Sequence, residues 1–149
     1  MSDDLNNPPL NYWYIGNSKF NLENGVYRLS KQIKRVFETR NPGNREVLII
    51  PWLRGEEKFL AVMDSLYVGI ICYENSSGVI DDIAKKILCE GERMDELEVS
   101  TTGRMTLPKE LTDLVGIHKK GIAAGMKNYF ELWNPEKYRR NMEKARVRI

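Results

Sequence analysis

The sequence VSTTGRMTLPKELTDLVGI at Val99–Ile117 decides the fold of this chain. It begins at the end of an alternating apolar and polar pattern, which is typical of a half-buried strand. Gly103 can adopt the positive φ angle that a tight turn requires, and Arg104 follows that turn directly. Pro108 suits the start of a helix, because its missing N–H would have no partner there. The stretch therefore predicts a strand, a turn with an exposed arginine, a short strand and a helix.

The predicted helix has one apolar face, and Gly116 after it favours a left-handed C-cap. Two further apolar segments, 122–125 and 129–133, are separated by a short polar connection, which is typical of a β-hairpin. The complete unit is a strand, a turn, a strand, a helix and a hairpin.

A weaker copy of this unit lies about 78 residues earlier in the chain. Gly25 matches Gly103, Leu29 matches Leu107, and Ser30 is a suitable N-cap in place of the proline. The helix face is also repeated, since Ile33, Val36 and Phe37 correspond to Leu111, Leu114 and Val115. Because the turn glycine, the strand and the helix face agree in one register, a tandem repeat is favoured over a chance match of two amphipathic segments.

The two copies differ in the turn itself. The position of Arg104 is Val26 in the first copy. Arg28 lies two residues further, on the same face of an extended strand, and can substitute for the missing arginine only in part. Before the turn, the match improves if one residue is inserted so that Phe20 corresponds to Val99.

The motif at Ser100–Ile117 and the segment YFELWNPEKY at Tyr129–Tyr138 resemble the MraZ family, and more broadly the swapped-hairpin AbrB/SpoVT-like DNA-binding domains. The family pattern is D-x-x-G-R, then an apolar residue, x-x-P and a short helix. Two such units in one chain fit MraZ better than the single-unit AbrB-like proteins. The resemblance is strong in the C-terminal half and degenerate in the N-terminal half. The motif Asp is replaced by Ser100 in the second copy and by Asn21 in the first.

The resemblance implies a mixed α and β fold, namely a β-rich, double-split, swapped-hairpin barrel built from two AbrB-like repeats with short helices. It implies a sequence-specific DNA-binding transcriptional regulator that is cytoplasmic and nucleoid-associated. Such a protein would form a homo-oligomeric ring on repeated promoter boxes of a division and cell-wall gene cluster. Its partners would be double-stranded DNA and further copies of itself. Arg104 would be the principal DNA contact, with the turn fixed by Ser100, Thr101 and Thr102 and electrostatic support from Arg28, Lys31, Lys34 and Arg35.

The expected organisation has five parts: a loose N-terminal arm at 1–11, the first repeat at 12–74, a linker helix at 77–91, the second repeat at 96–133 and a basic C-terminal helix at 134–149. Residues 40–65 are longer than the corresponding stretch of the family. Apolar runs at 47–53 and 59–63 precede a third run, Leu66–Tyr73, that we also interpret as a strand. Either earlier run could be its hairpin partner, and the sequence leaves this open.

The net charge of +2 indicates little, but its distribution is uneven. Five Lys or Arg residues stand against one acid in Lys31–Arg45, and six against one in Lys137–Ile149. Eight acids and three bases occupy Glu74–Glu98. A basic surface of this kind can follow DNA phosphates, although each cluster alone is also compatible with an ordinary solvated helix face. For the C-terminal helix, a DNA contact and a contact with a neighbouring subunit both remain possible.

The sequence lacks the patterns of an enzyme. Its single histidine, His118, has no nucleophile near it in sequence, and no phosphate-binding loop, serine elbow or Cys/His metal spacing is present. No apolar run reaches the roughly 18 residues of a membrane span. We therefore expect no catalytic activity, cofactor, metal, small-molecule substrate or membrane partner. The alternatives to a DNA-binding regulator are an oligomeric scaffold of the same fold that does not bind DNA, and an AbrB-like antitoxin-type partner protein.

Overall fold

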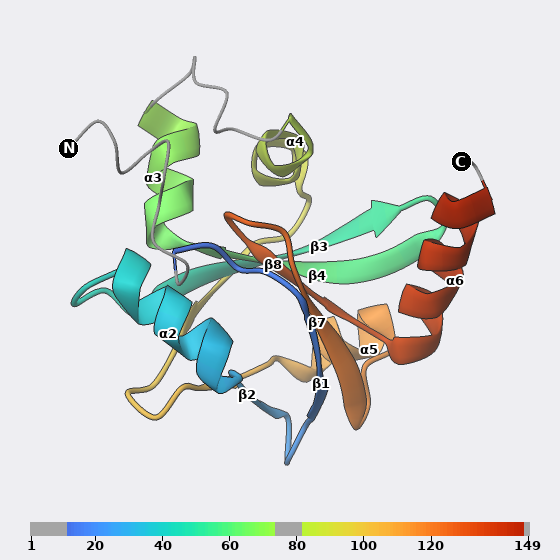
Figure 1. The fold of residues 1–149 in the computed structure, drawn as a ribbon, viewed down its shortest axis with the longest axis horizontal. Coiled ribbons are helices and arrows are strands. Elements are labelled where there is room, and N and C mark those ends of the chain that lie inside the picture. The colour runs from blue at the N-terminus through green and yellow to red at the C-terminus, as the bar shows by residue number, and fades with distance from the viewer. Residues whose placement is uncertain (1–11, 74–81, 148–149) are drawn as a thin grey trace.

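The computed structural model describes residues 12–73 and 82–147, and one order of elements occurs in it twice (Figure 1). The first copy consists of β1 (Asn17–Asn21), β2 (Val26–Arg28), α2 (Lys31–Arg40), β3 (Glu46–Arg54), β4 (Glu57–Asp64) and α3 (Ser65–Tyr73). The second consists of β5 (Asp95–Glu98), β6 (Arg104–Thr106), α5 (Lys109–Val115), β7 (Lys120–Gly125), β8 (Phe130–Trp133) and α6 (Pro135–Val147). Helix α4 (Asp82–Glu90) stands between the copies.

The two copies exchange their hairpins. Six antiparallel strands form one sheet in the order β1-β7-β8-β4-β3-β5, so that β1 pairs with the hairpin of the second copy and β5 with that of the first. Strands β2 and β6 form a separate antiparallel ribbon. The mixed α and β class and the swapped hairpins are therefore confirmed.

The barrel is not closed, and this part of the prediction is wrong. Strands β1 and β5 end the sheet on opposite sides, and in the described residues they do not pair with each other. Each of them instead leaves the sheet through a tight turn and continues into the β2–β6 ribbon, which lies across one face of the sheet (Figure 1).

The main core fills the space between the sheet and the ribbon. Tyr27 and Met105, which are paired at the middle of the ribbon, both point inward and are buried. Helices α2 and α5 add their apolar faces to this core. In α5 the buried residues are Leu111, Thr112 and Val115, whereas Leu114 is 42% exposed. The predicted apolar face of this helix is thus wrong at one position, because a seven-residue helix presents only a narrow stripe to the core.

The opposite face of the sheet is covered by α3 and α4 (Figure 1). Residues 65–73 therefore form a helix, and the strand predicted there is wrong. The Asp64 carboxylate accepts a hydrogen bond from the Tyr67 backbone N–H at 2.9 Å, which caps the first turn of α3. The hairpin partners are the two earlier runs themselves, since β3 and β4 pair along their length. These two strands occupy most of residues 40–65.

Helix α4 corresponds to part of the predicted linker helix, whose first residues, like the N-terminal arm at 1–11, lie outside the described ranges. Ala84, Ile87 and Leu88 are buried in the second core, whereas Ile83 is 50% exposed. Among the described residues, no helix is both long enough and apolar enough to cross a membrane.

A buried ion pair within the first copy, Arg40 with Asp64, is also hydrogen-bonded to the hairpin of the second copy. Arg40 Nε lies 2.7 Å from Asp64 Oδ2, and both side chains are almost fully buried. Arg40 also donates to the Asn128 backbone carbonyl at 3.1 Å, and the Tyr14 hydroxyl donates to Asp64 at 2.7 Å. Burial, followed by the charge of Asp64, raises the pKa of Tyr14 well above its ordinary value. Arg40 is therefore a structural residue and contributes nothing to the basic surface predicted at 31–45.

Candidate nucleic-acid interface

The centre of the candidate site is the outer face of the β2–β6 ribbon. Arg28 and Arg104 are directly paired across the two strands, and both are exposed. Since side chains alternate along a strand, the buried Tyr27 and Met105 point the other way. The ribbon thus brings together one arginine from each copy. Like charges directly opposite each other destabilise a strand pair unless an anion lies near them.

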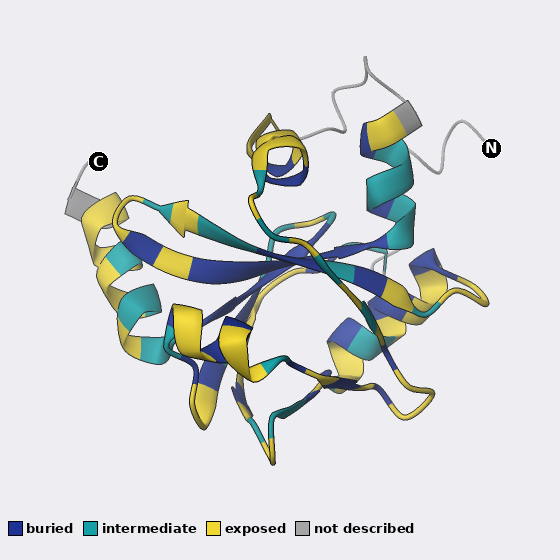
Figure 2. Cartoon of the chain, turned by 180° about the vertical axis from the view of Figure 1, so that it is seen from behind, coloured by how far each residue is buried: buried dark blue, intermediate teal, exposed yellow. Residues whose placement is uncertain are grey.

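The turn before Arg104 is held by Ser100. The Ser100 Oγ accepts the backbone N–H of Arg104 at 3.0 Å and lies 3.0 Å from the Thr102 hydroxyl. Ser100 also exchanges backbone hydrogen bonds with Arg104 and Gly103, and Gly103 has a φ of +79°. Serine at this position therefore supplies the side-chain acceptor of the turn. Thr101 is exposed. Exposed segments such as this turn are drawn in yellow in Figure 2.

This arrangement gives a stability prediction for the turn. Replacing Ser100 with alanine should lower the free energy of unfolding by about 1 kcal/mol, because the Arg104 N–H loses its side-chain acceptor. Ser100→Asp should restore most of that loss. Urea denaturation of both variants is the measurement, with Thr101→Ala as the exposed control that is expected to leave the midpoint unchanged. A loss for Thr101→Ala equal to that for Ser100→Ala would contradict the role given to Ser100.

Two cations from the first copy lie behind this turn. Arg45 donates to the backbone carbonyls of Val99 and Ser100, both at 2.6 Å. A Cβ at position 103 would lie 2.9 Å from Cδ of Lys34, so the Lys34 side chain packs against the turn glycine. Both cations also approach Glu38, at 3.6 Å and 3.7 Å. Arg45 was not predicted as a site residue from the sequence. The one feature that could have indicated it is its position at the end of the basic segment Lys31–Arg45.

The other predicted cations lie on α2. The Ser30 hydroxyl accepts the Ile33 N–H at 3.2 Å and caps this helix, which places Lys31 in its first turn. Lys31 lines the same cleft as Arg28 and Arg104. Arg35 is exposed one helical turn further, so it extends the basic face away from the ribbon. The structure therefore brings Arg28, Lys31 and Arg104 together, with Lys34 on the turn and Arg35 at the margin.

The turn of the first copy is different. Asn24 and Gly25 both have positive φ angles, +54° and +79°, and Glu23 and Val26 are joined by backbone hydrogen bonds on either side of them. This is a compact two-residue turn of the kind that favours Asn-Gly. It lies at the opposite end of the ribbon from the Ser100 turn, since the Leu107 N–H donates to the Gly25 carbonyl. Its acidic Glu23 makes it a weaker site for an anion.

The basic side of α6 is largely engaged within the chain. Arg140 Nε lies 3.0 Å from Glu57 Oε1, Lys144 lies 3.9 Å from Glu56, and Lys137 donates to a backbone carbonyl of α5. The hydrogen bond from Arg140 lowers the pKa of Glu57. Helix α6 lies to one side of the sheet, away from the ribbon (Figure 1). Its ion pairs fasten it to the β3–β4 hairpin, which leaves it a poor candidate for the main DNA contact.

His118 lies on the surface, with Nδ1 3.9 Å from Asp113. In the described part of the chain, no group of three or more His, Cys, Asp or Glu side chains could hold a metal ion.

Comparison with known proteins places the chain in a family. A family model described as "MraZ protein, putative antitoxin-like" matches residues 94–148. A protein of Xanthomonas oryzae pv. oryzae named Transcriptional regulator MraZ is 31% identical over 112 residues, which cover 70% of this chain and 71% of that protein. Its namesake in Xanthomonas campestris pv. campestris (strain 8004) is 29% identical over 105 residues, 70% of this chain and 64% of the relative. A third, from Delftia acidovorans, is 38% identical over 55 residues, 37% of this chain and 38% of the relative. The chain belongs to the MraZ family.

Proposed function

We propose that this chain is a transcriptional regulator that binds double-stranded DNA in a sequence-specific manner, through the outer face of the β2–β6 ribbon and the Ser100–Gly103 turn. The observation that carries the proposal is the cross-strand pair of exposed arginines, Arg28 and Arg104. Neither forms an ion pair within the described residues, whereas Arg40, Arg54 and Arg140 each have a carboxylate partner. A phosphate or a base edge over the ribbon would relieve the repulsion between the two guanidinium groups.

The proposed roles follow from the geometry. Arg104 leaves a rigid turn and is the principal base-reading residue, because an arginine can donate two hydrogen bonds to a guanine edge. Arg28 supplies the second guanidinium, which compensates in part for valine at position 26.

The remaining residues contact the DNA backbone or support the turn. Lys31 and Arg35 contact phosphates, and Lys34 and Arg45 hold the turn in place. Ser100, Thr101 and Thr102 present hydroxyl groups to the DNA backbone.

We further propose that the protein acts as a homo-oligomer, in the form of a ring on repeated promoter boxes of a division and cell-wall gene cluster. The end strands β1 and β5 of the sheet support self-association, since each has one edge without a strand partner in the described ranges. Exposed strand edges are often covered by another chain. Such a protein would be cytoplasmic, nucleoid-associated and without enzymatic activity. The name of the relatives, Transcriptional regulator MraZ, supports regulation of transcription.

The competing proposals are a scaffold that does not bind DNA and an antitoxin-type partner protein. Valine at position 26 favours the scaffold, and the word antitoxin in the description of the matching family model favours the other. The pairing of Arg28 with Arg104 weakens the case for the scaffold, because the first copy still contributes an arginine to the shared face. An adjacent toxin gene would support the antitoxin proposal, and a downstream cell-wall cluster would support the regulator.

The proposal is tested by DNA binding across a salt series. Fluorescence anisotropy would compare a duplex from upstream of the chain's own gene with a scrambled duplex. Lys31→Ala should weaken both complexes alike and reduce the slope of log K against log salt by about 0.9 for each phosphate that the variant no longer neutralises. Lys31 is preferred over Lys34 for this test because Lys34 also packs on Gly103. The absence of wild-type binding to either duplex at low salt would refute the proposed function.

A further inference from the structure

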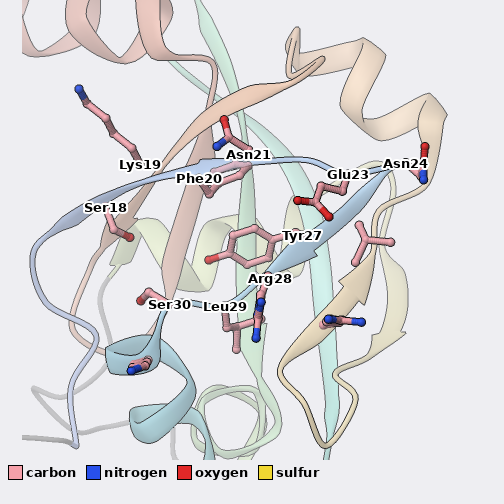
Figure 3. A pocket seen from close by; sticks show the side chains of 13 residues that line it. Ser18, Lys19, Phe20, Asn21, Glu23, Asn24, Tyr27, Arg28, Leu29 and Ser30 are labelled. Carbon is pink, nitrogen blue, oxygen red and sulfur yellow. The ribbon is translucent and has the colours of Figure 1, made fainter.

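A cleft of about 740 Å³ opens between β1 and β2 beside the start of α2 (Figure 3). Its apolar walls include Phe20 and Leu29, and its polar lining includes Ser18 and Ser30. Small-molecule sites in proteins have volumes of roughly 300–1,000 Å³ and combine apolar walls with a few convergent polar groups. The cleft therefore has the size and lining of a site for a small ligand.

The floor of the cleft carries an unpartnered hydroxyl group. Tyr27 is 1% exposed, and its hydroxyl has no hydrogen-bond partner among the described residues. Burial raises the pKa of this phenol, so the group remains a proton donor. Figure 3 shows the Tyr27 hydroxyl turned toward the side of the cleft where the hydroxyls of Ser18 and Ser30 also lie. A buried polar group without a partner costs about 1–3 kcal/mol, which a ligand acceptor would recover.

Uncompensated positive charge surrounds the same cleft. Lys19, Arg28, Lys31 and Arg104 line it, and none of the four forms an ion pair in the described part of the chain. Among the described residues that line the cleft, Glu23 is the one acid. Four cations and several hydroxyl donors match a doubly charged group with several acceptor oxygens, such as a phosphomonoester. The apolar walls match a ring-bearing body attached to it.

We propose that the cleft binds a small phosphomonoester with an aromatic or heterocyclic body, of the nucleoside monophosphate class, and that the Tyr27 hydroxyl donates a hydrogen bond to it. A free small molecule fits better than a DNA phosphate, because Tyr27 lies on the inner side of β2, whereas a duplex would meet the outer face. Since Arg28 and Arg104 border both surfaces, the ligand and DNA compete. That competition rests on the proposed function.

The test begins with calorimetric titration of the full chain, without DNA, with adenosine 5′-monophosphate, adenosine and inorganic phosphate as probes. Saturable binding of the monophosphate that is at least about tenfold tighter than that of either fragment is expected. The absence of such binding overturns the proposal, and it leaves the proposed DNA binding untouched because no DNA is present.

Tyr27→Phe provides the second readout. Without ligand, it should raise the melting temperature by about 2 °C or more, because it removes a buried group that lacks a partner. It should also weaken binding of the monophosphate about tenfold. Tyr14→Phe is the matched control: it removes a hydroxyl that is bonded to Asp64, so it should lower the melting temperature and leave ligand affinity unchanged.

Two results would overturn the assignment. A lower melting temperature for Tyr27→Phe would mean that the hydroxyl already has a partner. Weakened DNA binding by Tyr27→Phe, without any binding of the monophosphate to the wild type, would assign the cleft to a DNA phosphate.

Competition between the monophosphate and DNA is measured last, by adding the monophosphate to the DNA complex of the wild type and of Tyr27→Phe. The monophosphate should displace DNA from the wild type at a concentration about tenfold lower than from the variant.

Discussion

Replacement of Arg40 with methionine is expected to lower the free energy of unfolding by about 3–5 kcal/mol. The change removes the partner of Asp64, a carboxylate that is 1% exposed, and leaves its charge buried. It also removes the donors to Asn128 at the turn of the β7–β8 hairpin, at 3.0 Å and 3.1 Å. Urea denaturation, with the melting temperature as a second measure, determines the loss.

The surface ion pair of Arg93 is the matched control. Arg93 lies 2.8 Å from both Asp95 and Glu110, but its side chain is 39% exposed. Arg93→Met should therefore cost less than about 1 kcal/mol, because solvent screens exposed pairs. The double variant Arg40→Met with Asp64→Leu should recover part of the loss, since it removes the unpaired charge. Equal losses for Arg40→Met and Arg93→Met would contradict the importance of burial.

Replacement of Arg104 with alanine is expected to have the largest effect on recognition. If Arg104 reads a guanine edge, its loss removes about 1–3 kcal/mol of discrimination for each site contacted. The ratio of affinities for the upstream and scrambled duplexes should then fall toward one. In an oligomer the effect is multiplied, because each subunit would contribute a turn.

Control variants are needed to distinguish the loss of base recognition from the loss of a positive charge. Arg139→Ala removes an exposed arginine on α6, away from the ribbon, and should preserve the affinity ratio. Arg28→Ala should lower the ratio less than Arg104→Ala, because Arg28 does not follow a rigid turn. Light scattering should show the same oligomer size for every variant. If Arg104→Ala leaves the ratio of affinities for the upstream and scrambled duplexes unchanged, another residue recognises the bases.

The local sequence predicted those parts of the fold that depend on backbone chemistry. The turn at Gly103 and the C-cap at Gly116, with a φ of +74°, both follow from residue types at defined positions. The repeat of the helix face was also visible, since Ile33, Val36 and Phe37 are all buried. Turns, caps and helix faces are determined by residues only a few positions apart in the sequence.

The features that were predicted wrongly depend on contacts distant in sequence. The run LYVGIICY in α3 is apolar on every side, so it has no periodicity that separates a helix from a strand. Its helical start is fixed by Asp64, which is held by Arg40 from another helix. The sheet is open because β1 and β5 turn away into the ribbon and do not pair with each other in the described residues, which no local pattern indicates.

In the candidate site, too, individual residues could be predicted from the local sequence, but their contacts with residues distant in sequence could not. The sequence identified Arg104 and Arg28 as separate candidates, but only the strand register places them opposite each other. Arg45 was not identified, because its role depends on carbonyl groups more than fifty residues away. The cleft below the ribbon was also not foreseen, since Tyr27 and Lys31 belong to different elements.

Photo-crosslinking tests directly whether DNA binds on the outer face of the β2–β6 ribbon. Thr106 is exposed on the outer face of β6, paired with Val26, and Lys144 is exposed on α6. A benzophenone amino acid would replace each residue in turn, with a labelled upstream duplex as the target. A covalent protein–DNA adduct is expected from position 106 and none from position 144. An adduct from position 144 but not from position 106 would contradict the assignment of the ribbon as the DNA-binding surface.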